Sequence, residues 1–518
     1  MKVNRFIYIM GVVLAVFTAT GCKKNLELVN PNAQTAQSFW KTQNDAVMGV
    51  NAAYAALLID GTYMRFTPLL LNVPGDDVRS NSPWGAMSNV GRFALGSADP
   101  AGYGWAFETY YHGINRCNQV IDNVPNITMD ADAKKAVLGQ AYFLRGLNYF
   151  HLVDMFGSVA LPLHEPKTSA DYLQPQQSEA AGWAQVEADF TTAITMLPTT
   201  YPNAADKGRA TKGAAMAYLG KTLLFNKKYA EASAQFKAVI DLGIYDLMAN
   251  YKDNFTTDFE NNKESIFEVQ FSATPGVGGT EDAWAGAPRP TWARASARAI
   301  TFAPRGFGWV DVQPSFSVLA EFQLEKTITD ELDPRLDATI FYNKPGAMIY
   351  GKSFAEFYKN SATDLNEIYC KKYQNGYGNK PNEFDWKSGI NERIMRYADV
   401  LLMYAECQNE LGNKAEAAKY IQKVRTRVNL PNREIEFAGL SQAEIREQLG
   451  HERLLEFCLE GHRFDDIKRW GWLKDPVKLA WLKSRDAEMN NYQPGREYFP
   501  IPQSEIDNNP GFKQNATY

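Results

Sequence analysis

Two segments of the chain combine tryptophan with aspartate, asparagine and arginine, a mixture suited to contacting sugar rings. Flat indole rings stack on apolar ring faces and lose little rotamer entropy when they do so. Asparagine, aspartate and the rigid guanidinium fork of arginine can hydrogen-bond neighbouring hydroxyls. Residues 60–105 and 272–315 hold this mixture without sustained periodicity. We therefore predict ligand contacts from eight residues in these segments: Asp76, Arg79, Asn81, Trp84, Trp105, Trp284, Trp292 and Trp309.

These residues also have a plainer interpretation. A tryptophan in a loop is about as often packed beneath that loop as it is available to a ligand. The adjacent carboxylates Asp76 and Asp77 can equally cap a turn or the start of a helix. Both interpretations stay open at the level of the sequence.

A dense group of charged residues near the C-terminus could be mistaken for a hydrolytic site. Two carboxylates that flank a glycosidic bond can hydrolyse it. The spacing of Arg453 and Glu456 is i,i+3 and that of Glu456 and Glu460 is i,i+4, which is typical of ion pairs within one helix. We therefore predict a structural network that holds this helix against its neighbours and comprises Glu452, Arg453, Glu456, Glu460, Arg463, Asp465 and Asp466.

Catalytic and metal-binding signatures are missing from the sequence. It has no His-Glu-x-x-His, no Gly-x-Ser-x-Gly, no phosphate-binding Gly-x-x-x-x-Gly-Lys-Ser/Thr and no Asp-x-Asp-x-Asp-Gly run. The five histidines do not pair at the spacing of metal ligands. We predict a protein that is not an enzyme and that uses no cofactor and no metal. A glycan-degrading hydrolase is the alternative.

Charge and cysteine content narrow the class further. The formal net charge is −5 and no basic stripe is present, which argues against nucleic-acid binding because a phosphate backbone requires such a stripe. Apart from Cys22, the widely separated Cys117, Cys370, Cys407 and Cys458 form no compact zinc motif. We expect them to be buried free thiols.

The N-terminus has the features of a lipoprotein signal. Lys2 and Arg5 precede an apolar run from Phe6 to Phe17, which is too short to span a bilayer. The run leads to Gly21-Cys22, and a small residue directly before a cysteine is typical of a site of acylation, although Ala19 stands where leucine is usual. We predict that residues 1–21 are removed and that lipidated Cys22 anchors the protein. A plain secreted protein is the alternative.

Helical periodicity appears in pairs. Met216, Gly220, Ala232 and Phe236 have the offsets of a tetratricopeptide-type helix–turn–helix unit, in which Gly220 and Ala232 permit close approach and Phe236 fills the gap. The same spacing recurs in Leu401, Ala405, Ala417 and Ile421. A degenerate third copy contains Tyr142, Gly146 and Tyr149, with a partner helix over 183–197, and a further helix over 107–124 precedes it.

These patterns predict a mostly α fold. Helix pairs form a scaffold over about 106–245 and 393–472, and long irregular loops over about 60–105 and 272–390 carry the ligand contacts. A few short strands complete the fold, one of them at residues 265–272, where apolar residues alternate. Residues 22–518 are expected to form a single domain.

Several motifs resemble those of one family. Residues 396–406 read RYADVLLMYAE, and residues 424–427 read VRTR. Residues 452–456 read ERLLE, and residues 460–471 read EGHRFDDIKRWG. The chain closes with FPIP at 499–502 and with QNATY at its end. Together with Tyr142–Gly146 and Phe156-Gly157, these motifs resemble the SusD/RagB family from Cys22 to Tyr518.

The resemblance implies a SusD-like fold and a role in nutrient uptake. Members of this family resemble lids over a TonB-dependent barrel of the SusC type in the outer membrane of Bacteroidetes-type bacteria. The resemblance further implies that the protein is lipid-anchored and faces the cell exterior. It also implies that the protein binds an oligosaccharide and hands it to the SusC-like partner. A peptide ligand is the alternative within the family, and the resemblance does not identify the sugar.

Overall fold

A computed structural model describes residues 39–273, 295–378 and 380–518 of the chain. The predicted signal peptide, Cys22, Trp284 and Trp292 lie outside the described residues. No helix in the described ranges is both long enough and apolar enough to cross a membrane.

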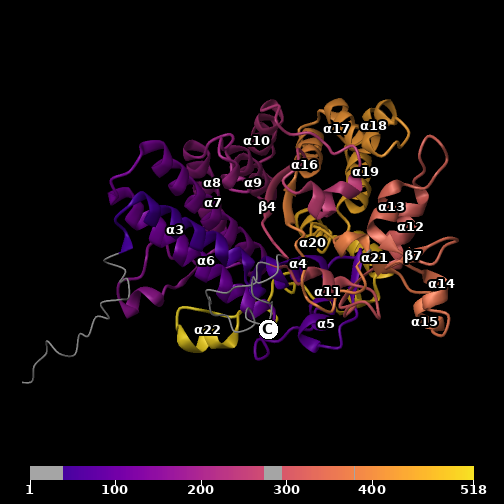
Figure 1. Cartoon of the computed structure of the whole chain (residues 1–518), viewed down its shortest axis with the longest axis horizontal. Helices are drawn as coiled ribbons and strands as arrows, with labels where there is room; N and C mark the ends of the chain where they lie inside the picture. The colour runs from indigo at the N-terminus through magenta and orange to yellow at the C-terminus, as the bar shows by residue number, and fades with distance from the viewer. Residues whose placement is uncertain (1–38, 274–294, 379) are drawn as a thin grey trace, which may run out of the picture.

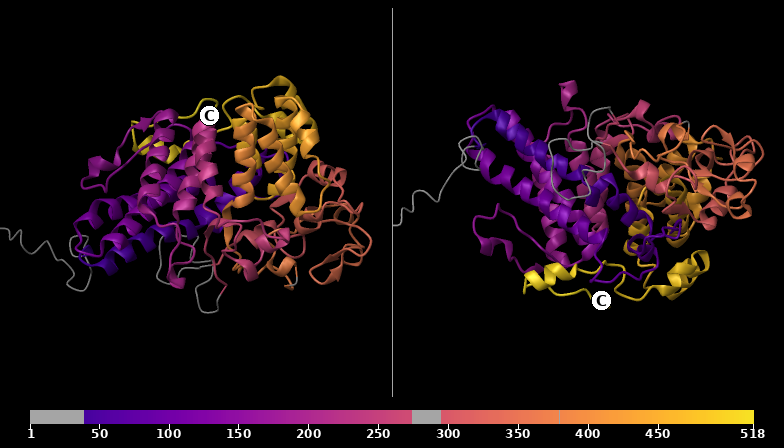
Figure 2. Two further views of the ribbon diagram at one scale, coloured as in Figure 1. Left: turned by 90° about the horizontal axis from the view of Figure 1, so that it is seen from above. Right: turned by 60° about the horizontal axis from the view of Figure 1, so that its bottom comes forward.

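A series of antiparallel helices runs through the molecule and forms its scaffold. The first half contains α6 (Tyr103–Asn123), α7 (Ala131–Phe156), α8 (Glu179–Met196), α9 (Lys212–Phe225) and α10 (Tyr229–Asp241). The second half contains α16 (Tyr397–Glu410), α17 (Lys414–Arg427), α18 (Glu434–Gly439) and α19 (Gln442–Phe457). From α6 to α10 each helix packs on its successor, α10 packs on α16, and α17 packs on α16, α18 and α19, so the two halves form one stack (Figures 1 and 2). The mostly α fold class is confirmed.

The close contacts predicted for the helix pairs are present. A Cβ added at Gly220 in α9 would lie 2.6 Å from the ring of Phe236 in α10, so only glycine permits this approach. In the third pair, Gly146 of α7 faces Phe190 of α8, and its added Cβ would lie 3.1 Å from that ring. The spacing of small and aromatic residues thus specifies the packing of these helices.

Shorter elements surround the scaffold. The strands pair two by two and antiparallel: β1 (Val78–Ser80) with β5 (Val312–Pro314), β4 (Ser265–Val269) with β10 (Glu392–Arg396), β2 (Val159–Ala160) with β3 (Gln176–Gln177), β6 (Ile340–Phe341) with β9 (Tyr369–Cys370), and β7 (Met348–Ile349) with β8 (Lys352–Ser353). The remaining helices are α3 (Gln43–Ala55), α4 (Phe66–Asn72), α5 (Gly85–Gly91), α11 (Arg298–Phe302), α12 (Phe316–Leu324), α13 (Pro334–Thr339), α14 (Phe354–Phe357), α15 (Ala362–Leu365), α20 (Arg463–Arg469), α21 (Pro476–Arg485) and α22 (Gln503–Asn508).

The segments predicted to be irregular contain several of these short helices. Residues 60–105 include a π-helical turn over Asp60–Met64 as well as α4 and α5, each of seven residues. Two helical turns are too short to show a period in the sequence, and Pro68 lies inside the first turn of α4. Cys117, Cys370, Cys407 and Cys458 are buried free thiols, as predicted.

The charged group near the C-terminus forms a buried ionic network. The Arg396 side chain donates to Glu264 (2.5 Å), Glu456 (3.0 Å) and Glu460 (2.7 Å). Arg335 lies 2.6 Å from Glu452 and 3.1 Å from Glu456, and all of these side chains are essentially inaccessible to solvent. These contacts join α19, α13, β4 and β10.

The predicted structural role of these charges is therefore correct, but the predicted intrahelical pairs are wrong. Arg453 pairs with Asp399 of α16 and with Asp466 of α20, each at 2.7 Å, and not with Glu456. The reason is that α19 is enclosed by α12, α13, α16 and α17, whose side chains reach its charges. Pairs at i,i+3 and i,i+4 stabilise exposed helix surfaces, and this helix has little exposed surface in the segment 452–456.

Replacing Glu456 by glutamine should strongly destabilise the protein. Burial favours a raised pKa for Glu456, but the charges of Arg427, Arg396 and Arg335 outweigh it and lower the pKa to about 2. Loss of this charge leaves three guanidinium groups without a shared counter-ion, at a cost of roughly 3–5 kcal/mol. Urea unfolding should show a much lower midpoint. Glu447→Gln, in an exposed pair of the same helix, should cost under about 1 kcal/mol, and equal midpoints for both variants would contradict the account.

His451 should make stability depend on pH on the alkaline side. Its ring nitrogens lie 3.0 Å from Glu321 and 3.0 Å from Glu325. Burial opposes its charge, but hydrogen bonds to these carboxylates outweigh burial and raise the pKa to about 9. The stabilisation is complete below the ordinary histidine pKa of about 6.5 and is lost as pH rises through about 9, a change of at most about 3 kcal/mol. Unfolding midpoints measured from pH 6 to 10 should fall for wild type and stay flatter for His451→Gln, whereas exposed His112→Gln should behave as wild type.

Candidate functional site

Four partly exposed tryptophans from separate parts of the chain lie close together, and three of them surround one arginine. Trp84 directly precedes α5, Trp105 lies in the first turn of α6, Trp309 follows α11, and Trp386 lies in the segment before β10. All four pack on the hydrophobic core with one side and remain partly accessible. We call these four residues the aromatic platform. In Figure 1, α4, α11 and α5 lie one below another in the lower half of the molecule.

Ring contacts fix the geometry of the platform. Trp309 and Trp386 meet edge to face with centroids 4.4 Å apart, and Trp84 and Trp105 are 5.9 Å apart. Phe66, the first residue of α4, contacts Trp105 at 5.3 Å and Trp84 at 6.0 Å from below. Edge-to-face packing of this kind holds each indole in one orientation.

Arg65 links the two halves of the platform. Its guanidinium carbon lies 4.8 Å from the centroid of Trp309, 5.8 Å from Trp84 and 5.9 Å from Trp386. The side chain is buried and approaches the Asp311 carboxylate at 3.8 Å. A desolvated guanidinium over indole faces contributes up to about 2 kcal/mol per contact, so Arg65 holds the rings in place.

The π-helical turn before Arg65 brings this residue under the platform. Gly61 lies against the backbone carbonyl of Trp105, so closely that a side chain at this position would collide with it. Asp60, in the same turn, is buried, and neither of its carboxylate oxygens has a hydrogen-bond partner within the described structure. Burial raises the pKa of Asp60 to about 6, and the charge of Arg65 partly opposes the rise.

Polar residues lie along the β1–β5 ladder next to the platform. The exposed Asn81 donates to the Gln313 side chain at 2.8 Å, and its backbone N–H donates to the Asp311 carbonyl at 3.0 Å. Arg79 pairs with Glu367 and lies 5.2 Å from the ring of Phe316. Its side chain is one-third exposed, but these two contacts already occupy part of the guanidinium. Of the two, Asn81 is the more available to hydrogen-bond a ligand.

Asp76 has a structural position that is incompatible with the predicted ligand contact. It is fully buried, and its carboxylate accepts from Arg463 at 2.5 Å and from Arg485 at 2.6 Å. Burial favours a raised pKa for Asp76, but these two arginines outweigh it and lower the pKa. Asp76 thus ties the segment before β1 to α20 and α21, and we correct the prediction accordingly.

The structure therefore brings together Trp84, Trp105 and Trp309 and adds two residues that sequence reasoning missed. Trp386 stands in a polar stretch within the predicted loop region 272–390, so its context alone could have marked it. Arg65 had no comparable signal, because nothing in its sequence neighbourhood indicates that three indoles surround it. Trp284 and Trp292 remain predictions, as they lie outside the described residues.

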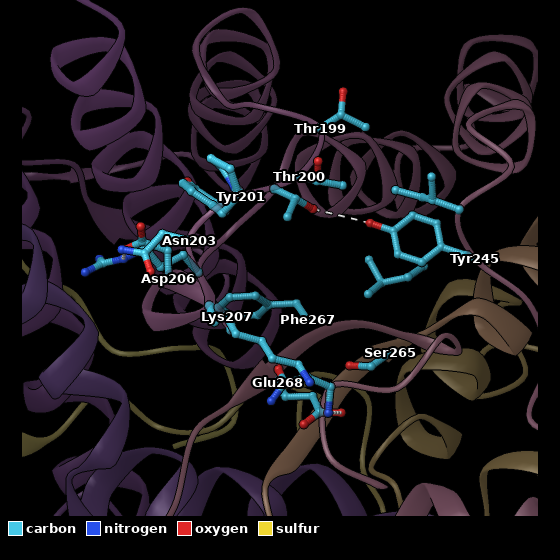
Figure 3. A pocket seen from close by; sticks show the side chains of 18 residues that line it. Thr199, Thr200, Tyr201, Asn203, Asp206, Lys207, Tyr245, Ser265, Phe267 and Glu268 are labelled. Carbon is cyan, nitrogen blue, oxygen red and sulfur yellow. Dashed lines mark hydrogen bonds and ion pairs between the residues drawn. The ribbon is translucent and has the colours of Figure 1, made fainter. Parts of the chain in front are cut away.

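A pocket that is separate from the aromatic platform lies elsewhere on the scaffold. Figure 3 shows this cavity of about 380 Å³, with Tyr201 and Lys207 on one side and Tyr245 on the other. Its charged residues are largely paired already, because Asp206 binds Arg209 at 2.7 Å and Glu268 binds Arg393 at 3.2 Å. The Tyr245 hydroxyl lies 3.3 Å from that of Thr211.

Asp60 and Asp311, the two carboxylates whose charges act on Arg65, are both buried. Flat apolar faces with an exposed amide at one side suit a sugar chain.

Comparisons with known proteins identify related families and relatives. The model of the "SusD family" matches residues 263–518, and a model described as "Starch-binding associating with outer membrane" matches residues 86–224. The chain is 27% identical to SusD-like protein P25 of Formosa agariphila, covering 96% of both chains.

Solved structures show the same fold. A SusD superfamily protein from Bacteroides vulgatus superposes with a TM-score of 0.80 at 27% identity, over 93% of this chain and 100% of that one. A laminarin-binding SusD-like protein superposes with a TM-score of 0.74 at 24% identity, over 92% of this chain and 100% of that one. Matching family models, full-length relatives and a shared fold together show that the chain belongs to the SusD family.

Proposed function

We propose that this protein captures an oligosaccharide or polysaccharide on the aromatic platform and delivers it to a SusC-like TonB-dependent barrel. The observation that carries the proposal is that Trp84, Trp309 and Trp386 surround the buried Arg65, with Trp105 next to Trp84. Three of these rings were predicted from sequence as separate sugar contacts. The starch-binding description of the matched family model and the laminarin-binding neighbour favour a glucan.

The proposal includes the cellular setting. A lipidated Cys22 would anchor the protein in the outer membrane, facing the cell exterior, as the description of one matched family model supports. Membership of the SusD family supports the proposal that the bound ligand is delivered to a barrel partner. The protein would act without catalysis, and the commitment of buried carboxylates such as Glu456 and Asp76 to ion pairs with arginine supports this.

Removing platform rings should abolish most of the affinity for a glycan. We expect Trp84→Ala and Trp309→Ala each to weaken binding at least about tenfold, because each removes a stacking face held by Arg65. Affinity electrophoresis against laminarin, starch and other soluble polysaccharides would first find the ligand, and calorimetry would then compare the variants. Trp481→Ala, a partly exposed tryptophan outside the platform, is the matched control.

The same mixtures distinguish the competing functions. Under the proposal the bound polysaccharide is recovered intact, whereas shorter products would establish the hydrolase alternative. Capture of a peptide with no glycan bound would keep an uptake role and contradict the sugar ligand. Unchanged affinity in a folded Trp84→Ala/Trp309→Ala variant would contradict the platform as the binding site.

Cys22→Ala should release the protein from the membrane fraction and leave its fold unchanged. Several acyl chains on one cysteine each add about 0.8 kcal/mol per buried methylene, so their loss removes the proposed anchor. Fractionation of cells with immunodetection measures the effect, and circular dichroism of the released protein checks the fold. Cys117→Ala, at a buried thiol, should stay with the membrane. Retention of the unacylated Cys22→Ala protein would show another tether.

A further inference from the structure

A cavity of about 400 Å³ lies between α6, the segment 160–174 and the C-terminal residues 505–512. Phe107 and Tyr111 of α6 form one wall, with their rings 5.0 Å apart, and Phe512 packs 6.3 Å from Phe107. Figures 1 and 2 show α22 returning from the far end of the chain to this side of α6. The volume is within the range of about 300–1,000 Å³ that is typical of small-molecule sites.

This α6–α22 cavity is distinct from the aromatic platform. Phe107 lines the cavity, whereas Trp105 belongs to the platform. Residues that are two positions apart on an α-helix are rotated by about 200° around its axis. Trp105 and Phe107 therefore lie on nearly opposite sides of α6, and so do the two sites. One site can therefore be changed without touching the other.

Hydrogen bonds between the three segments hold the walls of the cavity in place. The Asn509 side chain donates to the Gln174 carbonyl at 2.8 Å, and the Tyr111 hydroxyl donates to the Ala160 carbonyl at 3.0 Å. A capping box of Thr168 and Asp171 fixes the short turn that presents Tyr172. The cavity is thus a built feature of the fold that joins three distant segments.

Hydrogen-bonding groups in the cavity remain uncommitted. The Asn115 side-chain oxygen is buried and has no hydrogen-bond partner within the described ranges. The partly buried Glu505 carboxylate likewise has no hydrogen bond or ion pair with the described residues, although the neighbouring amides of Asn118 and Asn509 are satisfied. A buried acceptor without a partner is unfavourable, and a ligand that donates a hydrogen bond to it removes this cost.

An exposed aromatic ring stands at the mouth of the same cavity. Tyr172 is 70% exposed and Leu173 is 53% exposed, which is unusual for side chains of this size in a fixed turn. The Tyr172 ring stacks on no other ring in the described structure. Its face is therefore available for a flat apolar surface.

We propose that the α6–α22 cavity is a second saccharide-binding site, which holds a neutral sugar ring against Tyr172 while its hydroxyls donate to Asn115 and Glu505. A ligand with one apolar face and several hydroxyl donors satisfies all three groups at once. The inference goes beyond the proposed function and uses none of the platform residues.

The test measures sugar binding when the platform has been disabled. Saturation-transfer NMR would screen glucose, galactose, mannose, maltose and cellobiose against the Trp84→Ala/Trp309→Ala protein. We expect at least one sugar to retain its signal, and addition of Tyr172→Ala or Glu505→Gln to reduce that signal at least fivefold. Phe259→Ala, which removes another exposed ring, is the matched control and should change nothing. Circular dichroism confirms that each variant is folded.

The contradicting outcomes are distinct from those of the proposed function. If no sugar binds once the platform is disabled, or if Tyr172→Ala and Glu505→Gln leave the signal unchanged, the second site is wrong while the platform stands. If Tyr172→Ala abolishes binding in the wild-type background while Trp84→Ala/Trp309→Ala has no effect, the platform assignment fails and the cavity stands. Binding of a lysine-rich peptide in place of every sugar would overturn the ligand class.

Discussion

Buried pairs of arginine and carboxylate hold the C-terminal half of this protein together and position its binding surface. Arg396 ends β10 and contacts Glu456 and Glu460, which belong to α19 and the turn after it. From the same strand, Glu392 pairs with Arg298 at the start of α11, and Trp309 follows that helix. Two of the segments that carry platform tryptophans, those of Trp309 and Trp386, are thus anchored at β10.

A second set of buried charges anchors the other side of the platform. Asp76 joins α20 and α21 to the segment that leads through β1 to Trp84. Buried ion pairs are expensive to desolvate and are often no more stabilising than apolar packing. They do require precise partners, however, and here each pair connects elements that lie far apart in the sequence. We therefore interpret them as devices that fix the arrangement of the loops.

Whether a feature could be predicted from the sequence depends on how far apart its interacting residues lie along the chain. The close packing of Gly220 on Phe236 was predictable because both residues belong to one helix pair with a recognisable spacing. The role of Asp76 was not, because Arg463 and Arg485 are 387 and 409 residues away in the sequence. Arg453 was assigned to Glu456 for the same reason, since its true partner in α16 is 54 residues distant. Each tryptophan could be proposed from the sequence as a separate sugar contact. Only the fold shows that Trp84 and Trp309 contact Arg65 and that Trp105 contacts the neighbouring Phe66.

A crystal structure of the protein with an oligosaccharide derived from the polysaccharide that it retains would show whether a sugar chain rests on the aromatic platform. We expect sugar rings stacked on at least two of Trp84, Trp105, Trp309 and Trp386, with the Arg65 side chain still buried. A well-ordered oligosaccharide bound elsewhere, with these four rings free of sugar, would contradict it.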